Sequence, residues 1–374
     1  MLLNTIVMHK MNRRSFGTIM TMGSLSMMSG RTLSTCSSSS ATSSTQKKKL
    51  GVALVGLGYY SRDLLAPALQ LTEHCELTGI VTGSPDKIPV WQEKYGIPDA
   101  NVYNYENMSG IANNDDIDVI YIVLPTGLHA KYAILAAETG KHVWCEKPMA
   151  IDVPECQDII DACRKNGVKL SIGYRVQHEP NMQEIMRLGQ EKTFGSITAG
   201  LSHAGYGGNG QPSGWRADKS LGGGALYDMG VYAINGIRHA MNSEPVAVSE
   251  ASHPRMHTEV DLTTAFMLEF TDGVMAECRT SVVEDINRLE LTCQNGSYYL
   301  SPMQTYNGLR GMRSDGVEIY TPIPNQQARQ MDDDALAIIN DTEVMVPGID
   351  GLRDIAIVNA VLKAAQTGGR VVLG

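Results

Sequence analysis

An apolar segment that ends in two glycines and leads into a helical pattern constrains the fold of this chain more than any other feature. The segment is LGVALVGLG, residues 50–58, and the helical pattern YYSRDLLAPALQL follows it directly. A near-continuous apolar run is typical of a strand in a parallel sheet that is buried on both faces. Gly56 and Gly58 allow a tight turn and the close approach of a pyrophosphate, toward which the next helix would point its N-terminal amides. The third small position of this turn is Ser61, which still permits close packing.

The alternation of strand and helix continues up to residue 174. Further apolar runs, separated by segments of helix length, are ELTGIVTG (76–83), DVIYIVLP (118–125), HVWCEKP (142–148) and KLSIGY (169–174). A glycine-rich turn alone is weak support for nucleotide binding, but within this βαβ pattern it predicts a doubly wound parallel sheet. We therefore predict an α/β Rossmann domain that binds NAD(P) over residues 47–174.

The pattern changes after residue 174 to long strands in succession, joined by short turns. The strand-like segments are SITAGLSHAG (196–205), PVAVSEASH (245–253), LTTAFMLEF (262–270), GVMAECRTSVV (273–283) and RLELTCQ (288–294). Such a succession predicts an α+β domain over residues 175–374, with an open, mostly antiparallel sheet and helices on one face. The other face would be free to pair with another copy of the chain, so we expect a homo-dimer or homo-tetramer.

The composition argues against several classes of protein. The formal net charge is −9 and the basic residues are scattered, which is unlike a nucleic-acid-binding protein. No apolar run is long enough to span a bilayer. The cysteines of residues 47–374 lie in regular-looking elements without metal-type pairs, so we expect no structural disulfide and no metal site.

Residues 1–46 have the composition of a targeting segment. A twin arginine, Arg13 and Arg14, precedes a weakly apolar stretch, and a tract rich in serine and threonine follows. This pattern predicts a twin-arginine signal for export of the folded protein to the periplasm, followed by a disordered linker. Two alternatives stay open. The segment could be a plain disordered tail, or residues 33–36, LSTC, could be a lipoprotein cleavage box that anchors the protein to a membrane.

The end of the second strand bears on the choice of cofactor. An enzyme specific for NAD usually carries Asp or Glu there, to bind both ribose hydroxyls. This chain has Thr82, Gly83 and Ser84 instead, with Lys87 close by. Hydroxyl and ammonium groups would accept a 2′-phosphate that a carboxylate would repel. The segment favours NADP over NAD, although an ordinary turn with a solvated lysine would have the same sequence.

Taken together, the motifs resemble those of the Gfo/Idh/MocA family of oxidoreductases, and within it the exported glucose–fructose and aldose–aldose oxidoreductases. The resemblance extends from residue 49 to residue 374. It rests on VGLGYYS, IVTGSPDK, LPTGLHAKYA, CEKPMA, GYRVQHEP, GWRADKSLGGGALYDMGVY and YNGLRG. It implies an enzyme whose nicotinamide cofactor and sugar meet at the carboxyl ends of the parallel strands.

The resemblance also implies a catalytic set. Lys147 of the E-K-P motif would reach the carboxyl edge of the sheet, beside Glu146, and the bond to Pro148 is a candidate cis bond. Asp228 and Tyr232 are four residues apart, so they would share one face of a helix. An adjacent ammonium favours the phenolate, so Tyr232 would act as the base with help from Lys147. Asp228 would bind a sugar hydroxyl.

Two groups of contact residues follow from the same resemblance. The cofactor would contact Gly56, Gly58, Tyr59, Tyr60, Thr82, Gly83, Ser84, Lys87, Pro125, Thr126, His129, Glu146, Lys147 and Arg175. The sugar would contact Lys147, Tyr174, Trp215, Arg216, Asp228, Tyr232 and Tyr306. His129 is expected to order its turn without taking part in the chemistry. Thr126 stands where relatives often carry Asn, which puts one cofactor contact in doubt.

The implied reaction oxidises an aldose at its anomeric carbon to a lactone, with NADP as the hydride acceptor. Soluble NADP is scarce outside the cytoplasm, so an exported enzyme would keep its cofactor bound and use a second sugar to reoxidise it. Three alternatives stay open. They are a dehydrogenase or reductase with exchangeable NAD(P), an NAD-dependent glycosidase similar to the α-N-acetylgalactosaminidases, and a sugar- or nucleotide-sensing protein without turnover.

Overall fold

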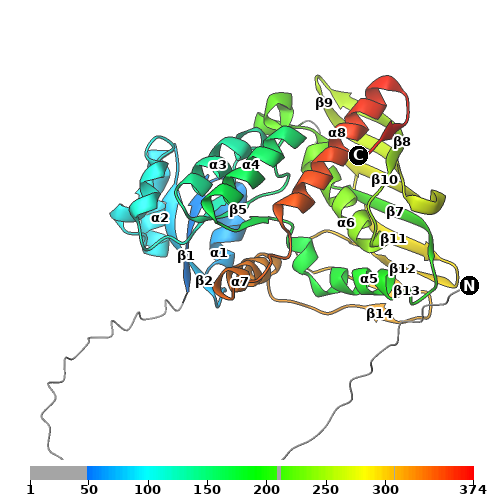
Figure 1. The fold of residues 1–374 in the computed structure, drawn as a ribbon, viewed down its shortest axis with the longest axis horizontal. Coiled ribbons are helices and arrows are strands. Elements are labelled where there is room, and N and C mark those ends of the chain that lie inside the picture. The colour runs from blue at the N-terminus through cyan, green and yellow to red at the C-terminus, as the bar shows by residue number, and fades with distance from the viewer. Residues whose placement is uncertain (1–48, 209–211, 307) are drawn as a thin grey trace, which may run out of the picture. The chain divides into compact units, whose positions relative to one another are not determined.

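A computed structural model describes residues 49–208, 212–306 and 308–374 of the protein (Figure 1). The predicted export signal and linker, residues 1–46, lie outside the described residues. The described cysteines are all buried and unpaired. Within the described ranges, no helix has the length and apolar character needed to cross a membrane, and no group of side chains is arranged to hold a metal ion.

Sheet A lies in the first half of the chain and is entirely parallel, which confirms the predicted Rossmann fold. Its order is β3-β2-β1-β4-β5-β6, so the strand order reverses between β1 and β4, where open α/β sheets bind their ligands. The strands are β1 (Leu50–Val55), β2 (Cys75–Val81), β3 (Val102–Tyr103), β4 (Val119–Ile122), β5 (His142–Cys145) and β6 (Leu170–Ile172).

Different helices cover the two faces of sheet A. On one face, Ile120 and Ile122 of β4 belong to an apolar cluster that includes residues of α3 (His129–Glu138) and α4 (Val153–Asn166). On the other face, Tyr121 lies in a cluster with residues of α1 (Ala66–Ala68), α2 (Ile88–Tyr95) and α7 (Gln326–Ile339). Helix α7 therefore returns from the C-terminal part of the chain to complete the cover of the parallel sheet (Figure 1).

Sheet B lies in the second half and confirms the predicted open, mostly antiparallel architecture. Its order is β14-β13-β12-β11-β7-β10-β9-β8-β15, and the pair β7–β10 is parallel while the other paired strands are antiparallel. The strands are β7 (Ile197–Gly205), β8 (Ala247–His257), β9 (Val260–Glu269), β10 (Met275–Ser281), β11 (Asn287–Cys293), β12 (Gly296–Leu300), β13 (Gly311–Arg313), β14 (Glu318–Ile319) and β15 (Val371–Val372).

Three helices pack against one face of sheet B, as Figure 1 shows: α5 (Pro180–Gln190), α6 (Val231–Met241) and α8 (Gly348–Thr367). A π-helical turn, Leu226–Gly230, leads directly into α6. Asp228 lies in this turn and Tyr232 in the first turn of α6. The start of α6 contacts both β7 and β10, so sheet B holds in place the segment that presents these two side chains.

Candidate active site

The turn after β1 has the open backbone that a pyrophosphate requires. Gly56 has a φ of +92°, and a Cβ atom there would lie 2.4 Å from the carbonyl oxygen of Val123. A Cβ atom on Gly58 would have no neighbour within 4 Å, so the backbone at Gly58 faces open space. The hydroxyl of Tyr60 is buried and has no hydrogen-bond partner among the described residues. An accessible glycine backbone beside an unpartnered buried hydroxyl fits a bound dinucleotide.

The loop after β2 is tied to this glycine turn. The Nζ atom of Lys87 donates a hydrogen bond to the carbonyl oxygen of Leu57 at 3.0 Å. The amide of Ser84 donates to the hydroxyl of Thr82, also at 3.0 Å. Residues 82–84 carry hydroxyls and no acid, and the ammonium of Lys87 lies at the phosphate-binding turn, whereas Asp86 of the same loop is exposed.

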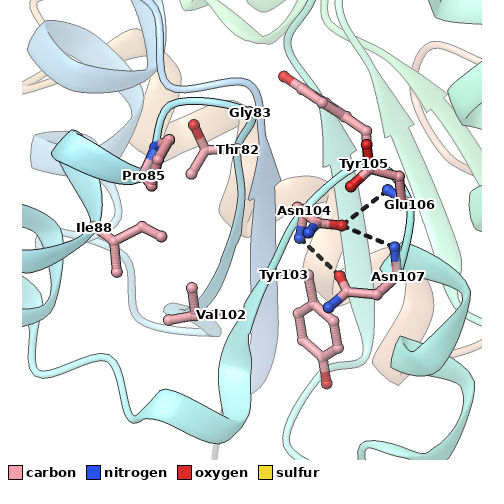
Figure 2. Close-up of a pocket in the computed structure, with 10 residues that line it drawn as sticks. All are labelled: Thr82, Gly83, Pro85, Ile88, Val102, Tyr103, Asn104, Tyr105, Glu106 and Asn107. Atoms are coloured by element: carbon pink, nitrogen blue, oxygen red, sulfur yellow. Dashed lines mark hydrogen bonds between the residues drawn. The ribbon is translucent and has the colours of Figure 1, made fainter.

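A pocket of about 290 Å³ lies at the carboxyl ends of β2 and β3. Figure 2 shows Thr82, Pro85 and Ile88 on one side and the loop of residues 104–107 on the other. Asn104 closes that loop by accepting hydrogen bonds from the amides of Glu106 and Asn107, both at 2.9 Å. The sequence analysis did not identify residues 102–107 as part of a pocket, because the two-residue strand β3 is too short to form a recognisable apolar run. The polar segment YNYEN, residues 103–107, was the sequence feature that could have indicated it.

Lys147, Asp228 and Tyr232 come together although they lie on different halves of the chain. The Nζ atom of Lys147 donates to the backbone oxygen of Asp228 at 2.8 Å and lies 3.8 Å from its carboxylate. The same Nζ atom lies 4.4 Å from the centroid of the Tyr232 ring. The ammonium is therefore adjacent to Tyr232, as expected, and it lies over the face of the ring. The Lys147–Pro148 peptide bond is cis.

The phenol oxygen of Tyr232 has another cationic partner, Arg175. One terminal nitrogen of the guanidinium donates to this oxygen, and the other donates to the side-chain oxygen of Gln304. The guanidinium also lies 4.5 Å from the centroid of the Tyr306 ring. Arg175 has no exposed surface, so its charge acts on the phenol in a poorly solvated environment.

The carboxylate of Asp228 lies near Lys147 and also binds two further side chains. Its Oδ2 atom accepts a hydrogen bond from the Nε atom of Arg216 at 2.9 Å and one from the hydroxyl of Tyr206 at 3.4 Å. The guanidinium of Arg216 lies 4.4 Å from the centroid of the Trp215 ring. Tyr206 directly follows β7 and was not among the predicted residues, because a single tyrosine at the end of a strand has no distinctive pattern.

Tyr174 and His129, two other predicted residues, pack next to the residues of the site. Tyr174 is buried, and its ring meets the ring of Tyr232 edge-on with the centroids 6.4 Å apart. The ring nitrogens of His129 lie 2.8 Å from the Pro148 oxygen and 2.7 Å from the Leu124 oxygen, and burial lowers the pKa of this histidine. His129 thus lies between the turn after β4 and the turn after β5, and in its neutral form it donates to one of these two carbonyl oxygens.

Thr126 and Pro125 form the turn that faces the glycine-rich loop. A Cβ atom on Gly222 would lie 2.7 Å from the Cβ atom of Thr126, and Gly222 has a φ of +76°. The loop before the π-helical turn therefore packs directly on the turn after β4. Tyr59 remains 62% exposed, whereas the ring of Tyr60 lies 6.4 Å from that of Tyr306.

The arrangement can carry out proton transfer at a hydroxyl group. The hydroxyl of Tyr232, which contacts one guanidinium, can exchange a proton with a bound hydroxyl group, and the carboxylate of Asp228 provides an acceptor for a polyhydroxylated ligand. These groups lie at the carboxyl end of sheet A, on the side of the open glycine turn.

Two protein-family models match the chain. Residues 50–174 match the Gfo/Idh/MocA model described as an oxidoreductase family with an NAD-binding Rossmann fold. Residues 182–299 match the model of the Gfo/Idh/MocA C-terminal domain. The matched ranges correspond to the parts that form sheet A and most of sheet B.

Similar proteins include both enzymes and solved structures. The chain is 28% identical to a D-xylose 1-dehydrogenase (NADP(+)) of Haloarcula marismortui, over 84% of this chain and 91% of that protein. It is 25% identical to a dTDP-3,4-didehydro-2,6-dideoxy-alpha-D-glucose 3-reductase of Actinomadura kijaniata, over 84% of this chain and 95% of that protein. The structure of an aldose–aldose oxidoreductase from Caulobacter crescentus complexed with glycerol has a TM-score of 0.83 and 34% identity, and covers 87% of this chain and 100% of its own.

Proposed function

Because the chain belongs to the Gfo/Idh/MocA family of oxidoreductases, we propose that it is an NADP-dependent enzyme that oxidises an aldose at its anomeric carbon to a lactone. The observation that carries this proposal is the convergence of Lys147 and Arg175 on Tyr232, with Asp228 beside the ammonium of Lys147. The similarity to an NADP-dependent xylose dehydrogenase and to an aldose–aldose oxidoreductase supports a sugar as the substrate.

The chain's own residues supply binding and proton transfer. The carboxylate of Asp228 accepts a hydrogen bond from a sugar hydroxyl and orients the ring. The phenolate of Tyr232 takes the proton of the anomeric hydroxyl while the C1–H bond breaks with both of its electrons and C1 forms a double bond to oxygen. Bound NADP⁺ supplies the hydride acceptor for this oxidation. Arg175 and Lys147 place positive charge at the phenol oxygen and over its ring during the transfer, and the protonated Tyr232 returns its proton to solvent once the lactone has formed.

The cofactor would be held by the glycine turn and the loop after β2. The open backbone at Gly58 and the amides that follow it would bind the pyrophosphate. The hydroxyls of Thr82 and Ser84 would face the adenosine ribose, and no carboxylate there opposes a 2′-phosphate. These features support NADP as the cofactor, in agreement with the predicted preference.

A direct test uses the purified protein, NADP⁺ and a panel of aldoses. With an aldose as the sole sugar, the proposal expects one NADPH, bound to the enzyme or released, for each lactone formed. Release of nitrophenol from aryl glycosides would instead support the glycosidase alternative. Binding of sugar or nucleotide without any product would support a sensing protein.

We also propose that the cofactor stays bound and that a second sugar reoxidises it. The carbonyl carbon of the second sugar would accept the hydride and its oxygen a proton, so one sugar leaves as a lactone and the other as a polyol. Incubation of the protein with mixed aldoses and ketoses, without added nucleotide, should give equal amounts of both products. Strict dependence on added NADP would instead establish a dehydrogenase with exchangeable cofactor.

Location and assembly complete the proposal. The pair Arg13 and Arg14 supports export to the periplasm through the twin-arginine route, and replacement of both residues by Lys should retain the protein in the cytoplasm. The face of sheet B opposite α5, α6 and α8 is the surface through which copies of the chain would pair as a dimer or tetramer. Light scattering of the purified protein would measure the oligomeric state.

A further inference from the structure

A buried chain of hydrogen bonds leads from α7 to the residue next to Lys147. The Nε2 atom of Gln330 donates to the hydroxyl of Tyr121 at 3.2 Å. The hydroxyl of Tyr121 in turn donates to the Oε1 atom of Glu146 at 2.7 Å. The three side chains are 1%, 0% and 6% exposed, respectively, so water does not compete for these contacts.

The carboxylate of Glu146 is fixed at both oxygens. Its Oε2 atom accepts a hydrogen bond from the backbone amide of Lys147 at 3.2 Å. A Cβ atom on residue 173 would lie 2.7 Å from Oε1, so only glycine at position 173 leaves room for this carboxylate. Glu146 is therefore clamped against the backbone between Lys147 and the segment that carries Arg175.

The charge of Glu146 depends on these partners. Burial raises the pKa of Glu146. The hydrogen bond from Tyr121 lowers this pKa more than the charge of Lys147 or the charge of Arg175 does individually. Several titratable or charged groups interact electrostatically with this carboxyl: Tyr60, Tyr121, Cys145, Lys147, Arg175 and Tyr306. Of these, Tyr121 is the one that donates a side-chain hydrogen bond to it.

We infer that Tyr121 and Gln330 are positioning residues that hold Glu146 ionised beside the reacting groups, so that the site favours the oxidised form of the bound cofactor. The inference rests on the proposed NADP-dependent function. The oxidised nicotinamide ring carries a positive charge that the reduced ring lacks. A fixed negative charge at the carboxyl edge of β5 therefore stabilises NADP⁺ relative to NADPH. Through Gln330, helix α7 thereby influences the ratio of NADP⁺ to NADPH in the site, although the helix itself packs on a face of sheet A.

The test measures the midpoint potential of the bound nucleotide in the purified holoenzyme, by dye-mediated redox titration with the absorbance of NADPH as the readout. Tyr121→Phe should favour the reduced form by about tenfold at neutral pH, a rise in potential of about 30 mV for a two-electron couple. Gln330→Leu should shift the ratio in the same direction by roughly threefold, because it only weakens the donor. A general loosening of the site would weaken both cofactor forms and leave the potential unchanged.

Two further variants make the outcome decisive. Glu146→Gln removes the charge, so it should raise the potential by itself, and adding Tyr121→Phe to it should produce no further change. Tyr298→Phe alters another buried tyrosine, in sheet B beside Phe194, and should leave the potential as in the native protein.

The pH dependence gives an independent check. Measured against free NADP(H) at the same pH, the preference of the native site for NADP⁺ should decline as pH falls through the pKa of Glu146. In Tyr121→Phe the decline should begin at higher pH, because the lost hydrogen bond had stabilised the carboxylate. An unchanged potential and pH profile in Tyr121→Phe would overturn the inference, whereas a native protein that binds no NADP(H) would overturn the proposed function itself.

Discussion

The guanidinium of Arg175 donates a hydrogen bond to the phenol oxygen of Tyr232, and both side chains are almost completely buried. The ammonium of Lys147 lies over the face of the same ring and donates to the backbone of Asp228. Two cations thus act on one phenol in different ways. Arg175 contacts the phenol oxygen itself, whereas Lys147 contacts the face of the ring and the backbone of Asp228.

Removal of the phenol oxygen should abolish most of the turnover. Tyr232→Phe leaves the ring in place, so the packing against Tyr174 and the contact with Lys147 can persist. We expect kcat to fall by roughly 100- to 10,000-fold, which is the usual contribution of a general base. Binding of NADP⁺, followed by fluorescence, should change little. Full activity in this variant would exclude Tyr232 as the base.

Replacement of Arg175 separates the effect of charge from the effect of geometry. Arg175→Lys keeps a positive charge but cannot bind Tyr232 and Gln304 at once, as the guanidinium does. Arg175→Met also removes the charge. Both variants should lower kcat, and Arg175→Met by more than Arg175→Lys, because the hydroxyl of Tyr232 loses a charged hydrogen-bond partner in a buried site. Equal losses of kcat in the two variants would mean that the charge at position 175 plays no part.

Tyr206 provides a test of the outer side of the site. Its hydroxyl donates to the carboxylate of Asp228, on the side where Arg216 also binds. Tyr206→Phe should raise KM for the aldose about two- to fivefold with little change in kcat, because the lost contact is weak and orients a substrate-binding group. A variant with lower kcat and unchanged KM would place Tyr206 in the chemical step.

The fold and the neighbouring positions of Asp228 and Tyr232 could be predicted from the sequence because they depend on short local patterns. A glycine turn after an apolar strand defines the ligand edge of sheet A, and a spacing of four places Asp228 and Tyr232 on one helical face. The pairing of the two segments came from the family resemblance. No local rule connects residue 147 with residue 232.

The remaining contacts depend on how distant segments pack. Arg175 and Tyr232 are 57 residues apart, and Gln330 and Tyr121 are 209 apart. The amphipathic pattern of α7 is equally compatible with packing on sheet B, so its return to sheet A could not be deduced from periodicity. The partner of the Tyr232 oxygen is likewise fixed by side-chain rotamers in a buried site, about which a sequence has no direct information.

The loop after β2 allows a test of cofactor choice. Ser84→Asp places a carboxylate where an enzyme specific for NAD has one, and Ser84 is only partly buried, so the fold should tolerate the change. The value of kcat/KM for NADP⁺ should fall by roughly tenfold or more, because the carboxylate repels the 2′-phosphate. Activity with NAD⁺ should rise, because the carboxylate can bind the ribose hydroxyls. The control Ser84→Ala should change the preference only slightly. Equal losses with both cofactors would mean that position 84 does not face the ribose.

Asp334 on α7 should make the stability of the fold depend on pH. It is fully buried, with one oxygen bound by the hydroxyl of Ser171 at 2.8 Å and the other without a hydrogen-bond partner among the described residues. Burial raises its pKa to about 6. An acid whose pKa is raised in the folded state binds its proton more tightly there than in the unfolded chain. Its contribution to stability is therefore fully present below about pH 4 and is lost as the pH rises through about 6.

Asp334→Asn removes this titration while keeping the shape of the side chain. The free energy of unfolding of the variant, relative to the native protein, should increase by on the order of 2 kcal/mol as the pH rises from about 4 to about 7. Urea denaturation at a series of pH values measures this difference directly, because groups common to both proteins cancel. A difference that stays constant over this range would show that Asp334 ionises as readily in the folded protein as in the unfolded chain.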